Sequence, residues 1–280
     1  MPEVPDLEAI RVFFNKRIVG ELVTRVEVPI PIVLRIPRDD FVRQLTGDTL
    51  GEVHRYGKYL LFSLGSGHVM VINAMLTGRF SYVQPKTKRH ARTCMVIGLQ
   101  NGNEIRYADQ RFMGRVYYVT PETLDTVPQF AEMGPDVLDP ALTEAAFKER
   151  LRKHTGMIKG IITNHKFIAG IGNAYADEVL WQARIHPYRK RTTLSDAEQG
   201  DLYRAVRSVV EWATPIVGQK MEETLDYSEW RDHLRVHRRG GKPCPRCGSE
   251  ISEITAGQRI TSFCRTCQGD ANAAAGQRAV

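Results

Sequence analysis

Four cysteines in the last quarter of the chain constrain its fold more than any other feature. They are spaced as Cys244-Pro-Arg-Cys247 and, sixteen residues later, Cys264-Arg-Thr-Cys267. Each C-x-x-C pair offers two thiolates on a tight turn, and two pairs at this separation are typical of a tetrahedral zinc site. We therefore predict one structural Zn²⁺ bound by these four thiolates. A four-cysteine iron site is the alternative that the spacing leaves open.

The segment between the two pairs adds a positive charge to this module. Residues 251–263 alternate in two short runs around Gly257-Gln258-Arg259, which predicts a β-hairpin with Arg259 at its tip. From residue 231 to residue 280 there are nine Lys or Arg against four Asp or Glu, and the whole chain carries a net charge of +7. A basic module indicates a phosphate partner, because neutralised phosphates release counterions. A merely solvated basic face, or a ribbon used only for folding or protein contact, is the alternative.

Composition limits where such a chain works. The fifth cysteine, Cys94, lies alone in an apolar run, so no disulfide framework is expected and a reducing compartment is favoured. No apolar run approaches the about 20 residues that span a membrane. We expect a cytoplasmic, nucleoid-associated protein without a membrane partner, and its 280 residues allow one to three domains.

The patterning along the chain predicts an α+β protein. Apolar residues at helical spacing predict a helix over 6–18, with Gly20 as its stop. Short alternating runs then predict an N-terminal antiparallel β-sandwich or barrel, with strands at 22–28, 49–54, 59–64, 68–74, 94–99, 104–107 and 116–119. Helices are predicted at 142–153, 157–163, 173–182 and 195–213. The predicted domains are 1–130, 131–238 and 239–270, followed by a disordered tail, 271–280.

The turn Ile168-Ala-Gly-Ile-Gly-Asn173 precedes one of these helices. Its glycines let the backbone approach a phosphate, and the next helix offers its free N–H groups. A Gly-x-Gly pair also fits an ordinary turn between helices. The pattern is longer than that, because it continues through Asn173-Ala-Tyr-Ala-Asp-Glu178 to Ile185-His-Pro187.

Four motifs together resemble one known family. Residues 158–180 resemble the helix-two-turns-helix segment of the formamidopyrimidine-DNA glycosylase and endonuclease VIII family. Met1-Pro-Glu-Val-Pro-Asp-Leu-Glu8 resembles the opening of that family, and Arg55-Tyr-Gly-Lys-Tyr-Leu60 resembles an internal motif. Residues 256–264 with the cysteine quartet resemble its C-terminal β-hairpin zinc finger. The motifs occur in the family's order over nearly the whole chain, which implies a monomer that binds double-stranded DNA containing a damaged base.

The N-terminus carries groups suited to the chemistry of this family. If Met1 is removed, Pro2 has a secondary α-amine, and α-amines titrate near pH 8, so a useful neutral fraction exists at physiological pH. Such an amine can attack a sugar C1′, expel a base and form an iminium. The resemblance implies that Pro2 is this nucleophile, Glu3 the acid/base and Lys58 an essential auxiliary. Taken alone, Pro2 also fits an ordinary proline after the start methionine, Glu3 a surface acid and Lys58 a solvated lysine.

The resemblance also implies a set of DNA contacts. Lys159, Asn173 and Arg259 are expected to bind the phosphates that flank the lesion, and Arg259 is counted with the catalytic residues. His90, which follows Lys86, Lys88 and Arg89, fits a further phosphate contact. The side chains expected to fill the space left by a flipped nucleotide are Leu76, Arg111 and Met113. For Leu76 and Met113, a place in the core is the alternative.

Several residues depart from the pattern usual in enzymes that act on oxidised purines. Leu76 stands where those enzymes have methionine, and Met113 where they have phenylalanine. The remaining departures are Asp6 for glutamate, Asn73 for histidine, and Asn164-His165 for an acid–glutamine pair. The segment 219–230 lacks the usual glycine-rich loop that caps a flipped base.

The function implied is that of a bifunctional DNA glycosylase and abasic-site lyase of base excision repair. It removes formamidopyrimidine and 8-oxoguanine type bases through a Pro2 Schiff base, followed by β,δ-elimination. An endonuclease VIII-like preference for oxidised pyrimidines or abasic sites is the alternative within the class. A non-catalytic binder of damaged DNA, or a zinc-ribbon protein acting on RNA or ribosomes, is the alternative from another class.

Overall fold

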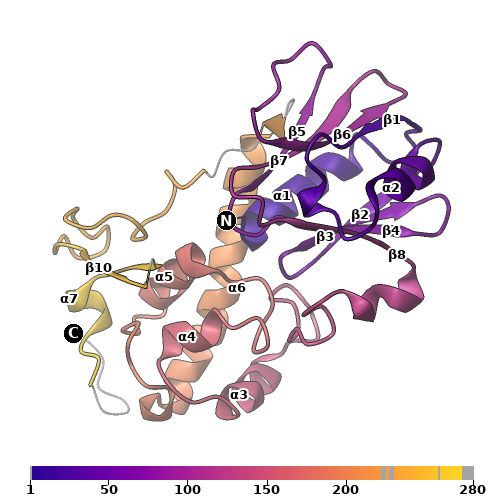
Figure 1. Ribbon diagram of the computed structural model, residues 1–280. Coiled ribbons are helices and arrows are strands. Elements are labelled where there is room, and N and C mark those ends of the chain that lie inside the picture. The colour runs from indigo at the N-terminus through magenta and orange to yellow at the C-terminus, as the bar shows by residue number, and fades with distance from the viewer. Residues whose placement is uncertain (1, 222–224, 227–229, 258, 273–280) are drawn as a thin grey trace. The chain divides into compact units, whose positions relative to one another are not determined.

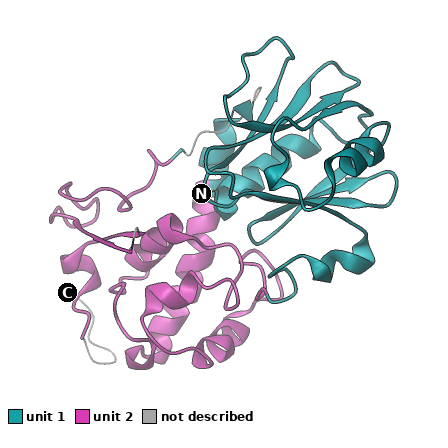
Figure 2. Ribbon diagram, viewed as in Figure 1, with its two compact units in different colours: residues 1–132, 214–230 teal, residues 133–213, 231–280 magenta. Residues whose placement is uncertain are grey.

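The computed structural model describes residues 2–221, 225–226, 230–257 and 259–272. The chain forms two compact units (Figure 2). Unit 1 comprises Met1–Glu132 with Thr214–Trp230, and unit 2 comprises Met133–Ala213 with Arg231–Val280. The predicted boundaries at 130, 238 and 270 stay predictions, and most of the predicted tail lies outside the described residues. Within the described residues, no helix is both long and apolar enough to cross a membrane.

Unit 1 contains two antiparallel sheets with a helix between them (Figure 1). The five-stranded sheet has the order β1-β6-β7-β5-β9, and the four-stranded sheet has the order β2-β3-β4-β8. The strands are β1 (Val23–Glu27), β2 (Leu50–Tyr56), β3 (Tyr59–Leu64), β4 (Val69–Asn73), β5 (Gly78–Val83), β6 (Thr93–Leu99), β7 (Glu104–Asp109), β8 (Arg115–Val119) and β9 (Leu225–Asp226). The predicted α+β class with an N-terminal sandwich is confirmed.

Helix α1 (Val4–Asn15) supplies the centre of this core. The ring of Phe14 lies 5.5 Å from Phe62 of β3 and 6.1 Å from Phe80 of β5, so one side chain contacts both sheets. The helix begins before the predicted residue 6 because proline is tolerated in a first turn. It ends before Ile18, which is buried beyond the helix and therefore extended the apolar pattern.

Helix α2 (Arg38–Leu45) and strand β5 were not predicted from the sequence. Helix α2 buries only Phe41 and Leu45, so its apolar periodicity covers little more than one turn. Strand β5 has a signal that the prediction overlooked, because Phe80 and Tyr82 are apolar residues two positions apart, as in a strand. The short 3₁₀ helices of this unit are η1 (Pro31–Val33) and η2 (Pro121–Thr126).

Unit 2 is helical and carries the predicted hairpin. Its elements are α3 (Glu144–Arg152), α4 (Ile158–Ile162), α5 (Asn173–Gln182), η3 (Arg191–Thr193), the first part of α6 (Asp196–Gln219), β10 (Ser252–Ala256), β11 (Arg259–Phe263) and α7 (Arg265–Gln268). Helix α5 has the predicted bounds. Helix α6 continues past the predicted residue 213 with Pro215 inside it. Burial of Val217 in the core of unit 1 accompanies this extension, so packing outweighs the hydrogen bond that proline removes.

Candidate active site and zinc centre

Pro2 and Glu3 stand at the first turn of α1. Both are buried, and Glu3 is the N-cap residue. The backbone N–H of Glu3 donates to Asp6 Oδ2 at 2.8 Å, one half of a reciprocal capping box. Asp6, one of the departures from the family pattern, therefore has a structural function here. The helix start thus restricts the backbone of Glu3, the residue that follows Pro2.

Lys58 lies in the two-residue turn between β2 and β3. Gly57 precedes it with φ +56°, a conformation that glycine adopts without steric cost. The side chain of Arg55 donates from Nη1 to the Gly57 carbonyl at 3.0 Å and from Nε to Glu8 Oε2 of α1 at 3.0 Å. Arg55 thus links the turn that carries Lys58 to the helix that begins after Pro2 and Glu3.

The carboxylate of Glu8 is held in its charged form. Burial opposes its ionisation, but hydrogen bonds and charges from Arg11 and Arg55 outweigh that effect and lower the pKa of Glu8. The link between α1 and the Lys58 turn is therefore an ion pair at neutral pH.

The three side chains predicted to enter DNA lie on two loops of unit 1. Leu76 is 40% exposed and Met113 is 37% exposed, and Arg111 is exposed as well. Exposure of two large apolar side chains excludes the alternative that they belong to the core. Their insertion into a duplex stays a prediction.

His90 lies in the loop between β5 and β6, half-exposed. Its Nε2 is 3.1 Å from Asp226 Oδ1 of β9, and Ser81 Oγ donates to the same oxygen at 3.1 Å. A cavity of about 200 Å³ beside His90 is lined by Arg79 and Arg92, among other residues, so the charged side chains in its lining are cations. The cavity is cationic, but the Asp226 carboxylate already contacts His90 Nε2, so the phosphate contact of His90 stays a prediction.

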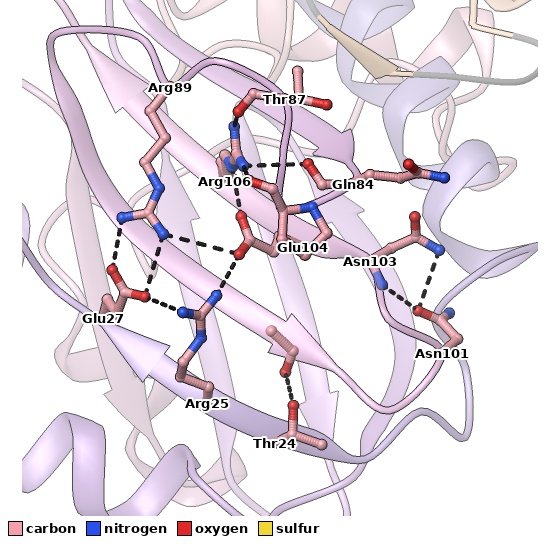
Figure 3. Close-up of polar contacts among 12 residues, drawn as sticks. Thr24, Arg25, Glu27, Gln84, Thr87, Arg89, Asn101, Asn103, Glu104 and Arg106 are labelled. Carbon is pink, nitrogen blue, oxygen red and sulfur yellow. Dashed lines mark hydrogen bonds and ion pairs between the residues drawn. The ribbon is translucent and has the colours of Figure 1, made fainter.

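The basic loop that ends at His90 is held by an ion cluster with a buried centre, Glu104 and Arg106 (Figure 3). Arg106, 3% exposed, donates to the carbonyls of Gln84, Pro85 and Thr87 at 3.3, 3.0 and 2.8 Å. Its Nε also donates to Glu104, 1% exposed, at 2.7 Å. This ion pair was not predicted from the sequence. The sequence signal for it is that Glu104 and Arg106 carry opposite charges and lie two residues apart, which places them on the same face of strand β7.

Three arginines surround the two acidic groups of this cluster. Arg89 binds Glu27 at 2.7 Å, and Arg25 binds both Glu27, at 2.6 Å, and Glu104. The hydrogen bond from Arg89 lowers the pKa of Glu27, although burial acts in the opposite direction. The basic loop is therefore fixed to the sheet at Arg106 and at Arg89.

In unit 2, the predicted phosphate-binding residues converge on strand β11. Asn173 Nδ2 donates to the Ile260 carbonyl at 2.7 Å, and Lys159 Nζ donates to the same carbonyl at 3.0 Å. Lys159 is buried and its Nζ lies 2.6 Å from Asp177 Oδ1. Lys159 therefore has a structural function that the sequence did not predict, next to exposed Arg259. Phosphate binding by these residues stays a prediction.

Two carboxylates of α5, also missed, bind the chain around the hairpin. Asp177 Oδ2 accepts from the Ser262 N–H at 3.0 Å and contacts His237 Nδ1 at 2.7 Å. Glu178 accepts three backbone N–H groups of residues 235–237, at 2.9 to 3.0 Å. Burial raises the pKa of Glu178, and these N–H groups counteract it. The sequence signal for these buried contacts was two adjacent acids, Asp177 and Glu178, in a helix that is otherwise mostly apolar.

The four cysteines form the predicted zinc site. Their sulfur atoms all lie within 4.8 Å of one another, with Cys244 and Cys267 3.8 Å apart and Cys247 and Cys264 3.5 Å apart. A tetrahedron with Zn–S bonds of about 2.3 Å has sulfurs about 3.8 Å apart, so the quartet fits one structural zinc ion. Trp181 Nε1 donates to Cys244 Sγ at 3.4 Å, which joins α5 to the metal centre.

Two parts of the predicted site fall partly outside the described residues. Of the segment 219–230, residues 222–224 and 227–229 are not described, whereas Leu225 and Asp226 form the edge strand β9. At the hairpin tip, residue 258 is not described.

Three family models match the chain. The formamidopyrimidine-DNA glycosylase N-terminal domain matches residues 1–116, and the H2TH domain of the same enzymes matches residues 133–224. The zinc finger found in formamidopyrimidine-DNA glycosylases and in isoleucyl-tRNA synthetases matches residues 241–269, which identifies the metal as zinc rather than iron.

Curated proteins and solved structures are similar over almost the full length. A formamidopyrimidine-DNA glycosylase of Pelotomaculum thermopropionicum is 35% identical, over 96% of this chain and 99% of its own length. One from Symbiobacterium thermophilum is 36% identical, over 96% of this chain and 89% of its own length. The Lactococcus lactis enzyme bound to DNA containing N7-benzyl-Fapy-dG has a TM-score of 0.88 at 28% identity, over 96% of this chain and 100% of that one. The Lactococcus lactis enzyme bound non-covalently to DNA with an abasic site has a TM-score of 0.86 at 28% identity, with the same coverage.

Proposed function

Because the chain belongs to the formamidopyrimidine-DNA glycosylase family, we propose that it is a bifunctional DNA glycosylase and abasic-site lyase of base excision repair. The observation that carries the proposal is that Pro2 and Glu3 are both buried at the start of α1, where the capping box with Asp6 restricts the Glu3 backbone. A protein that only binds DNA needs neither group. Action on DNA also supports a place at the nucleoid.

The chemistry assigned to Pro2 is a substitution at the sugar followed by elimination. The neutral amine of Pro2 attacks C1′ and forms a C–N bond, while the bond to the damaged base breaks and its electron pair leaves with the base. The amine loses its proton, and ring opening of the sugar gives an iminium. β-Elimination and then δ-elimination expel the 3′ and 5′ phosphates, so that the strand is cut on both sides of the sugar.

Glu3 and Lys58 are assigned the proton transfers and the charge near the sugar. A carboxyl group next to the nucleophile can protonate the sugar ring oxygen as the base leaves. The capping box with Asp6 supports this assignment because it restricts the Glu3 backbone. The Lys58 turn is tied to α1 through Arg55, and a lysine there suits a nearby phosphate or a proton transfer.

The proposed substrate is duplex DNA with an oxidised base of the formamidopyrimidine or 8-oxoguanine type. Solved relatives are bound to DNA containing a benzylated Fapy lesion or an abasic site, which supports this class. We assign phosphate binding to His90, Lys159, Asn173 and Arg259, and insertion into the stack to Leu76, Arg111 and Met113. Leu76 and Met113, which differ from the residues usual in purine-specific members, favour oxidised pyrimidines as the second candidate.

Borohydride trapping on a panel of duplexes tests the proposal. Each duplex carries one lesion: a formamidopyrimidine, 8-oxoguanine, an oxidised pyrimidine or an abasic site. We expect a covalent complex that Pro2→Gly, or retention of Met1 verified by mass spectrometry, sharply reduces, while binding to an uncleavable abasic analogue persists. Full trapping by protein that keeps Met1 contradicts the mechanism, and trapping restricted to pyrimidine lesions selects the second candidate.

A further inference from the structure

Two short loops of unit 1 connect the same two strand pairs. Residues 74–77 lead from β4 to β5, and residues 110–114 lead from β7 to β8. Gly78 is paired with Asp109 in the five-stranded sheet, and Asn73 is paired with Arg115 in the four-stranded sheet. Both ends of one loop therefore lie beside both ends of the other, and the two loops cross between the sheets together.

The carboxylate of Asp109 binds both loops. Its Oδ1 accepts from Thr77 Oγ1 of the first loop and from the Arg111 N–H of the second, the latter at 3.1 Å. Its Oδ2 accepts from the Gly114 N–H at 2.6 Å, at the other end of the second loop. The Arg111 N–H also donates to Thr77 Oγ1, at 3.0 Å. Asp109 is 0% exposed, so the carboxylate end of its three bonds is shielded from water, and the bond to Gly114 is fully buried.

The backbone of both loops adopts unusual conformations next to the exposed side chains. Met75 has φ +48° and Phe112 has φ +54°, both in the left-handed region that L side chains rarely adopt. Such conformations persist only where the surroundings hold them. Met75 adjoins Leu76, and Phe112 lies between Arg111 and Met113.

The ends of the loops also close on one buried side chain. A Cβ added at Gly78 would lie 2.3 Å from the Tyr107 hydroxyl oxygen, and one added at Gly114 would lie 1.8 Å from it. Each distance is shorter than any real contact, so both positions require glycine. The two loops are thus packed against Tyr107 and bonded to Asp109, and neither can shift without the other.

We propose that Asp109 is a positioning residue that couples the two loops, so that Leu76, Arg111 and Met113 enter the DNA stack as one rigid group. The inference rests on the proposed function. Asp109 acts through Thr77 and through the backbone of the second loop. An ionised carboxylate can accept from all three donors, whereas an amide presents an N–H group to at least one of them.

Asp109→Asn tests the coupling with two readouts on a duplex that carries 2-aminopurine beside an 8-oxoguanine. We expect the fluorescence rise that reports unstacking to fall, together with a single-turnover excision rate reduced about ten- to hundredfold, the factor expected for one lost hydrogen bond to a charged group. The excision rates measured with different bases opposite the lesion should become more alike. Borohydride trapping on a single-stranded abasic oligonucleotide should persist, because that substrate has no stack to enter.

Asp48→Asn is the control with the same kinds of donor, at a carboxylate that is half-buried rather than fully buried. The carboxylate of Asp48 also accepts from two backbone N–H groups and one hydroxyl, those of Thr49 at 2.7 Å and of Ser66 at 3.0 and 2.6 Å. We expect Asp48→Asn to lower the melting temperature but to leave the fluorescence rise intact. An equal loss of signal in both variants means that general destabilisation is the cause, and overturns the proposal.

Substitutions of Thr77 separate coupling from the folding of one loop. Thr77→Val removes the hydroxyl and leaves Asp109 bonded to its own loop, whereas Thr77→Ser keeps the hydroxyl. We expect a reduced fluorescence rise for Thr77→Val and recovery for Thr77→Ser. A wild-type signal in Thr77→Val refutes the coupling. Absence of trapping by the wild-type protein on the abasic strand instead refutes the proposed function, so the two failures are distinguishable.

Discussion

Glu104→Gln removes one negative charge from the buried centre of the ion cluster that holds the basic loop. Glu104 is 1% exposed and Arg106 is 3% exposed, so the substitution leaves a guanidinium in the protein interior without its closest counter-charge. Breaking a buried pair by removing one partner costs about 3–5 kcal/mol. Glutamine still offers an oxygen to Arg106, which keeps its three carbonyl acceptors, so we expect about 3 kcal/mol.

Scanning calorimetry measures this effect. For a unit of this size, each kcal/mol lowers the melting temperature by about 2–4 °C, so the transition of unit 1 should fall by about 6–12 °C. Asp40→Asn is the control, because its pair with Arg43, at 2.6 Å, is exposed and should contribute at most about 1 kcal/mol. Equal small shifts in both variants would refute the reasoning that burial sets the magnitude.

Arg106→Gln tests what the basic loop does. Arg106 holds the carbonyls of Gln84, Pro85 and Thr87, and the loop continues through Lys86 to His90. If the cations of this loop bind phosphates, Arg106→Gln should weaken binding to undamaged duplex and reduce its dependence on salt concentration, because the loop loses the guanidinium that fixes its backbone. An unchanged salt dependence in a destabilised variant argues against a contact between this loop and DNA.

Four further outcomes are expected. Glu3→Gln should lower the rate of base excision by about 10²–10⁴-fold. It should lower the rate of cleavage at a preformed abasic site less, because no base is expelled there. Equal losses on both substrates contradict a role of Glu3 in base release. Cys247→Ser should lower the zinc content measured by atomic absorption and unfold the hairpin, because metal binding and folding are coupled there; active protein without zinc argues against the site. The pKa of Glu8 is lowered from its ordinary 4.5, so its stabilisation is present above that value and lost as the pH falls through the lower folded pKa. The stability difference between wild type and Glu8→Gln should therefore shrink from pH 6 to pH 3, and a constant difference rejects the ion-pair account. Arg259→Ala should weaken binding to damaged and undamaged duplex alike, and should reduce the slope of log affinity against log salt concentration by about one. Arg111→Ala should alter only the preference for the base opposite the lesion. If Arg259→Ala changes that preference and Arg111→Ala does not, the two assignments must be exchanged.

Features set by neighbouring residues were predictable from the sequence. The bounds of α5 and β3 follow from local pattern and from the glycines before each element. The cysteine spacing determined a four-thiolate metal site, because two tight turns place their four thiolates within reach of one ion. The end of α6 was missed because Pro215 is a local stop signal that burial of Val217 outweighs.

The pairing of distant residues was decided only by the tertiary structure. Lys159 reads as a solvated cation or a phosphate ligand in the sequence, but its ammonium binds Asp177 and Thr261, the latter 102 residues away. Asp109 looks like one polar residue of a loop motif until the sheet pairing brings Thr77 to its carboxylate. Local pattern specifies which backbone conformations are favourable. The partner of a buried charge depends on which segments the sheets and helices bring together, and that is a property of the packed core.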